Sequence, residues 1–103
     1  MFTFNQFIPL SGISKAGTEQ HITQTLSNAN AFTPYIPPGA KVIAVMSTAQ
    51  NSRYTLTGDA PTTSKGFQMK AGDPPILISL NGNIKLQFIA ETSGAILEYE
   101  FGR

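Results

Sequence analysis

Apolar and polar residues alternate along the C-terminal third of this chain, in short runs separated by turn-forming residues. A period of two is typical of strands that bury one face. The runs cover residues 76–80, 84–89 and 95–101. Asn81-Gly82 lies between the first two runs and favours a two-residue hairpin turn, because both residues tolerate positive φ angles. The pattern therefore predicts a hairpin across Asn81-Gly82 and a three-stranded antiparallel meander.

Five further short segments upstream are predicted as strands. Residues 41–47 are apolar on both faces, which indicates a central strand. Residues 19–26 are mostly polar, and residues 32–35 contain Pro34, so both segments are predicted at sheet edges. The other two segments are residues 53–57 and residues 66–69.

Helical periodicity is nearly absent, and Gly and Pro interrupt the chain at short intervals. We therefore predict an all-β fold: an antiparallel β-sandwich or a jelly-roll-like barrel of about seven to nine short strands. A chain of 103 residues fits one domain. Residues 18–103 are predicted to form this domain, and residues 1–17 to form an N-terminal arm, or a first strand followed by a flexible segment.

The first ten residues carry three phenylalanines, Phe2, Phe4 and Phe7. They have two interpretations. They form either a first strand of the core or an extended arm that adds to the sheet of a neighbouring subunit. We expect an interface that includes these three rings together with Pro34 and Tyr35.

The charge content is low for a protein of this size. Charged residues make up 13% of the chain, against about 25% in an average soluble domain. A neutral polar surface of this kind favours packing against other proteins. The net charge of +1, with no run of like charge, argues against a nucleic-acid partner.

Several classes of protein are disfavoured by what the sequence lacks. No apolar run is long enough for a membrane helix, so no membrane partner is expected. The first ten residues do not resemble a signal peptide, so we expect synthesis in the cytoplasm. Cysteine is absent, which excludes disulfides and thiolate metal sites.

Candidate catalytic chemistry is sparse. The single histidine, His21, is predicted on a solvated strand face, and Glu98 and Glu100 on another exposed face. Asp59 and Asp73 lie in turns, where Asp commonly bonds to the local backbone. We therefore predict no catalytic residue, no metal site and no cofactor, and a protein that is not an enzyme.

Two turn-rich segments, residues 53–62 (RYTLTGDAPT) and residues 66–74 (GFQMKAGDP), read as one unit. With the strands that follow them, over roughly residues 36–103, they resemble small structural proteins of tailed bacteriophages. Where that pattern has Asp-Gly, this chain has Gly58-Asp59.

The resemblance implies a β-rich, oligomeric virion component made in the host cytoplasm. Such a protein is a capsid decoration (cement) protein or a head or tail accessory protein, and its partner is the major capsid protein or another virion protein. We also expect self-association, with a trimer favoured. The alternative is a receptor- or glycan-binding β module of a phage fibre or tail, which would show a concave aromatic site.

Overall fold

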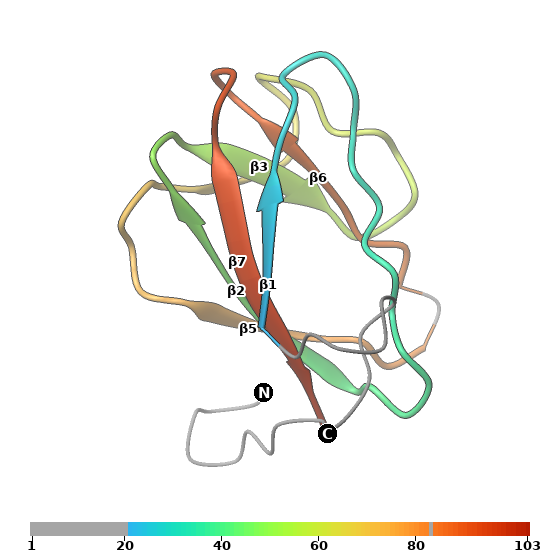
Figure 1. Ribbon diagram of the computed structural model, residues 1–103. Coiled ribbons are helices and arrows are strands. Elements are labelled where there is room, and N and C mark those ends of the chain that lie inside the picture. The colour runs from blue at the N-terminus through green and yellow to red at the C-terminus, as the bar shows by residue number, and fades with distance from the viewer. Residues whose placement is uncertain (1–20, 83) are drawn as a thin grey trace.

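Seven strands form two antiparallel sheets in the computed structural model, which describes residues 21–82 and 84–103 (Figure 1). The strands are β1 (His21–Thr25), β2 (Val42–Thr48), β3 (Ser52–Thr55), β4 (Phe67–Met69), β5 (Ile76–Ser79), β6 (Gln87–Ala90) and β7 (Ile96–Gly102). The predicted all-β class is confirmed, and the two sheets pack as a sandwich. Within the described residues, no helix is long and apolar enough to cross a membrane.

The larger sheet has four strands in the order β1-β7-β2-β5. The apolar strand β2 lies between β7 and β5, as its two apolar faces predicted. The polar strand β1 pairs only with β7 and forms one edge, which was also predicted. The opposite edge of this sheet is β5.

The smaller sheet has three strands in the order β4-β3-β6. Beyond β6, residues 32–35 contribute only an isolated bridge between Phe32 and Phe88, not a full strand. The two residues exchange backbone hydrogen bonds of 2.7 and 2.8 Å. This segment lies at a sheet edge, in agreement with the position of Pro34.

The predicted hairpin across Asn81-Gly82 is wrong, and so is the three-stranded meander. β5 pairs with β2, whereas β6 pairs with β3, so the Asn81-Gly82 turn leads from one sheet to the other. A type I′ hairpin turn needs positive φ at both central residues. Gly82 has a φ of +76°, but among the described non-glycine residues only Ala49 has a positive φ.

The core lies between the two sheets and is built from the inward positions of the central strands. β7 alternates as predicted, so that Glu98 and Glu100 face outward. Burying each large apolar side chain contributes roughly 1.5–3 kcal/mol. The buried core includes Ile43, Val45, Leu86, Phe88, Leu97, Tyr99 and Phe101.

The two sides of the sandwich differ. On the β1–β6 side, the chain after β1 crosses between the sheets: the Leu26 N–H donates to Ala95 O, and Ser27 O accepts from the Ala90 N–H (Figure 1). On the β5–β4 side, the β4–β5 connection, residues 70–75, also crosses from one sheet to the other, and a cavity lies beneath it. Phe67 of β4 is exposed on this side, and we call it the open side.

Candidate interaction surface

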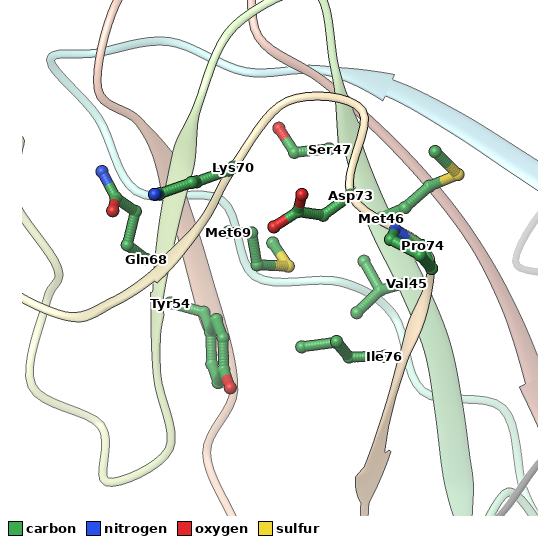
Figure 2. Close-up of a pocket in the computed structure, with 10 residues that line it drawn as sticks. All are labelled: Val45, Met46, Ser47, Tyr54, Gln68, Met69, Lys70, Asp73, Pro74 and Ile76. Atoms are coloured by element: carbon green, nitrogen blue, oxygen red, sulfur yellow. The ribbon is translucent and has the colours of Figure 1, made fainter.

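A cavity of about 170 Å³ lies between the sheets on the β5–β4 side (Figure 2). Its apolar lining comes from both sheets and includes Val45 from β2, Met69 from β4 and Ile76 from β5. Its polar lining comes from Ser47, Gln68, Lys70 and Asp73. An apolar cavity of roughly 150 Å³ accommodates one benzene ring. This cavity therefore has the size and lining for a single aromatic or aliphatic side chain.

The turn that carries Lys70 and Asp73 is held by backbone contacts. The Asp73 N–H donates to Lys70 O at 3.2 Å, which closes the turn, and the Gly72 N–H donates to Ser47 O at 3.0 Å. The neighbouring Ala71 N–H donates to the Asn51 side-chain oxygen at 2.8 Å. These bonds anchor the turn to β2 and to the β2–β3 connection, so this part of the cavity lining is fixed.

Phe67 faces inward but is uncovered. It lies opposite Tyr54 in the β3–β4 pair, with ring centroids 5.4 Å apart, and Tyr54 lies 6.1 Å from Phe88 on its other side. Phe88 is fully buried, so this aromatic row points toward the core, yet Phe67 is 61% exposed. Burial raises the pKa of Tyr54. Phe67 lies on the outermost strand, where the larger sheet no longer covers it.

A shallow hollow adjoins Phe67 at the end of β3. Its apolar part is formed by Phe67 and Leu56, and its polar part by Thr57, Asp59 and Lys65. Lys65 Nζ lies 4.0 Å from Asp59 Oδ2. The hollow extends the apolar surface of the open side beyond the cavity.

A polar network on the outer face fixes the edge strand β4. The Gln68 side-chain amide donates to Glu91 Oε2 at 2.8 Å, and Arg53 Nε lies 2.7 Å from the same oxygen. Arg53 Nη1 also donates to Gly66 O at 2.9 Å. These three contacts join β4 to β3 and to the end of β6. The exposed Phe67 is therefore carried on a well-anchored strand.

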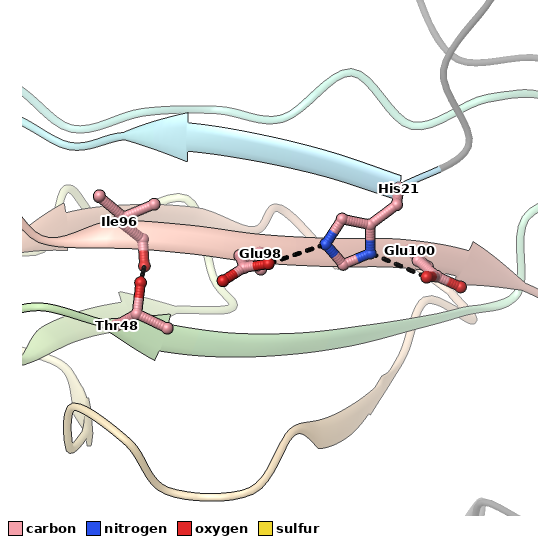
Figure 3. A network of polar contacts seen from close by, with 5 residues as sticks. All are labelled: His21, Thr48, Ile96, Glu98 and Glu100. Atoms are coloured by element: carbon pink, nitrogen blue, oxygen red, sulfur yellow. Dashed lines mark hydrogen bonds and ion pairs between the residues drawn. The ribbon is translucent and has the colours of Figure 1, made fainter.

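A second cluster, formed by His21, Glu98 and Glu100, lies on the outer face of the larger sheet (Figure 3). His21 Nδ1 is 2.8 Å from Glu100 Oε2, and His21 Nε2 is 3.0 Å from Glu98 Oε1. Both ring nitrogens donate only in the imidazolium form. Hydrogen bonds to Glu100 and Glu98 therefore raise the pKa of His21.

This cluster ties the edge strand β1 to β7. The exposure of all three side chains was predicted, but their meeting was not, because the β1–β7 register brings together residues far apart in the sequence. Across residues 21–82 and 84–103, no group of three or more His, Cys, Asp or Glu side chains is arranged to hold a metal ion. The arrangement is that of a charged clamp between two strands.

The predicted interface residues are only partly accessible in the structure. Tyr35 is 45% exposed, whereas Pro34 is buried. Phe2, Phe4 and Phe7 lie outside the described residues. The sequence did not single out Phe67, although its alternation with Met69 placed both on one strand face.

Among the described residues, the open side, the charged clamp and the exposed pair Tyr35 and Ile36 could each act on a partner. The open side joins a cavity to Phe67, the most exposed large apolar side chain of the described residues, and it is the candidate interaction surface. Comparison with known proteins adds no relative from which a role could be carried over. No family model matches this chain, and neither a curated protein nor a solved structure matches it.

Proposed function

We propose that this protein is a structural component of a phage particle, a capsid decoration protein or a head or tail accessory protein, that acts through protein–protein contacts and not by catalysis. The observation that carries the proposal is the open side of the sandwich. There an inward-facing aromatic ring, Phe67, is left uncovered next to Tyr54, whose side chain lines the cavity.

The character of the surface supports the same function. Interface cores are depleted in charged residues and enriched in aromatic ones. β5 carries no charged residue, and the chain as a whole is only 13% charged. The resemblance of residues 53–62 and 66–74 to small structural proteins of tailed phages favours a virion as the place of assembly.

The test is binding to phage particles produced without this protein. We expect the purified protein to bind such particles and to raise the temperature at which they open, because a ligand that binds only the assembled state stabilises it. Phe67→Ser should weaken both effects. Tyr35→Ser, on another exposed aromatic residue, is the matched comparison.

The possible results of this binding test distinguish an error in the contact surface from an error in the proposed function. Loss of binding with Tyr35→Ser and not with Phe67→Ser would move the contact away from the open side. A wild-type protein that neither binds nor stabilises the particles would overturn the virion function itself.

A glycan-binding function is the second candidate, and the hollow beside Phe67 favours it. An exposed aromatic ring with Thr57, Asp59 and Lys65 around it provides a stacking face and convergent polar groups. Calorimetric titration with a panel of host-surface saccharides would measure it directly. Binding that Phe67→Ser abolishes, in a protein that leaves particles unaffected, would favour this alternative.

A further inference from the structure

The free edge of β5 is the starting point. β5 pairs only with β2, so one side of its backbone has no strand partner among the described residues. The Leu80 N–H donates to Lys41 O at 2.8 Å in the same register. Because bonded pairs alternate along an antiparallel ladder, Ile78 and Ile76 also bond toward β2. Leu77 and Ser79 therefore present their backbone N–H and C=O groups at the free edge.

β5 itself carries no charged side chain and no proline, two of the features that usually block strand pairing. Exposed edges are commonly protected by charged side chains, by proline or by bulges. β5 has the sequence Ile-Leu-Ile-Ser, with no charge, and only Pro74 and Pro75 precede it. An extended segment can therefore add to it through main-chain hydrogen bonds.

The cavity lies at the start of this edge, beside the first residue of β5 and the β4–β5 connection. Ile76 of β5 is part of its wall, together with Val45 and Met69. A strand added to β5 would direct alternate side chains toward the same inner face. The volume of about 170 Å³ fits one phenyl ring. The site therefore accepts an uncharged, extended segment with aromatic residues at alternate positions.

The chain itself contains such a segment in the residues that precede β1. Phe2 and Phe4 flank Thr3 at the spacing of one strand face, and residues 1–14 carry no charged side chain. We propose that residues 2–4 of a second copy of this chain add as a strand to the free edge of β5 and insert a phenylalanine into the cavity. This inference rests on the proposed function, assembly through the open side, and identifies the partner there.

The proposed function, assembly through protein–protein contacts, is the reason for choosing a second copy over the same copy. The described chain begins at His21, at the edge of the larger sheet opposite β5, and β7 and β2 separate the two edges by about 14 Å at the usual strand spacing. The 16 residues between Phe4 and His21 span about 50 Å when extended, so the same copy is also within reach, and the cross-linking test separates the two.

Cross-linking tests the contact in the full-length protein, which contains no cysteine of its own. If Phe2 and Phe4 point into the cavity, Thr3 points to the outer face, as Leu77 and Ser79 do. Oxidising a mixture of Thr3→Cys protein with Leu77→Cys or Ser79→Cys protein should yield a covalent dimer with one copy of each. Thr3→Cys mixed with Thr23→Cys, at the opposite edge of the same sheet, should not.

Proline variants provide a matched pair for association in solution. Ser79→Pro removes an N–H that faces the free edge, so no bond inside the sheet is lost. Thr23→Pro does the same on β1. The Leu26 N–H bonds to Ala95 O, and bonded pairs alternate along the ladder, so the Thr23 N–H points to the free edge of β1 and not toward β7. Light scattering over a dilution series should show self-association weakened about tenfold or more by Ser79→Pro and little changed by Thr23→Pro.

The outcomes are distinguishable. Equal effects of the two proline variants, or no mixed dimer, would overturn the docking of this segment on β5. A Thr3→Cys/Leu77→Cys double variant that closes a disulfide within one chain would overturn the exchange between copies. If Ser79→Pro does not fold, the cross-linking experiment alone tests whether residues 2–4 dock on β5. A protein that binds particles but fails these tests keeps the proposed function and loses this inference.

Discussion

The imidazole of His21 and the carboxylate of Glu100 face each other across the β1–β7 pair, with His21 Nδ1 2.8 Å from Glu100 Oε2. The second ring nitrogen lies 3.0 Å from Glu98, so the ring joins two carboxylates of one strand to the neighbouring edge strand. The pair gives the sheet edge a charge that depends on pH, because only the imidazolium can donate to both.

Replacing His21 with Gln should remove a pH-dependent part of the stability. The pKa of His21 is raised above 6.5 in the folded protein, so its stabilisation is fully present below pH 6.5 and is lost as the pH rises through the folded pKa. The His21 side chain is 49% exposed. Solvent screening therefore limits the gain to about 1 kcal/mol at most.

Two measurements check this prediction. Urea unfolding near pH 6 should show the wild type more stable than His21→Gln, and the difference should vanish in alkaline buffer. Proton NMR of the single histidine should give a pKa above 6.5. A titration at or below that value would show that the clamp does not form in solution.

Phe67 and Phe88 flank Tyr54 on the same sheet face, yet substituting them should have very different costs. Phe88 is fully buried, so Phe88→Ala should destabilise by about 3–5 kcal/mol. Phe67 is 61% exposed, so Phe67→Ala should cost less than about 1 kcal/mol. Chemical denaturation of the two variants, at a concentration where the protein is monomeric, measures both. An equal cost would mean that Phe67 is covered in solution.

Ser47 and Ser52 are both buried, but replacing them with alanine should have different effects on stability. Ser47 Oγ donates to Gln50 O at 2.7 Å, whereas the Ser52 hydroxyl is buried with no hydrogen-bond partner in the described part of the chain. Ser47→Ala should destabilise by about 1 kcal/mol through loss of that bond, and Ser52→Ala should be neutral or stabilising. The urea concentrations at the unfolding midpoints of the two variants, compared with that of the wild type, test both predictions. A clear loss with Ser52→Ala would show that its hydroxyl is satisfied in solution.

The strands could be located from the sequence because alternation, and short apolar runs between turn residues, are local properties. The predicted runs at residues 41–47, 76–80 and 95–101 match β2, β5 and β7 closely. Their partners could not be located, because alternation shows which side chains face inward but not which strand lies alongside. Asn81-Gly82 is compatible with a hairpin, and it serves equally well in the connection between two sheets.

The open side was not predictable for the same reason. Phe67 and Met69 share a strand face, and the sequence treats them alike, but Met69 is 6% exposed and Phe67 is 61% exposed. The difference depends on how far the other sheet extends, which is set by long-range packing. The clamp at His21 likewise depends on the register of β1 against β7.

Gly66 and Gly82 should respond differently to alanine, although both have positive φ. Gly82, at φ +76°, has no atom within 4 Å of the position that a Cβ would take, so Gly82→Ala carries only the backbone strain, about 1–2 kcal/mol. Gly66 has a φ of +126°, and its Cβ would lie 2.9 Å from the Tyr54 carbonyl oxygen. Because that oxygen belongs to the central strand of its sheet, it cannot move without disturbing the β3 pairing. Gly66→Ala should therefore cost clearly more than Gly82→Ala in urea unfolding, and equal costs would contradict the close approach of Gly66 to β3.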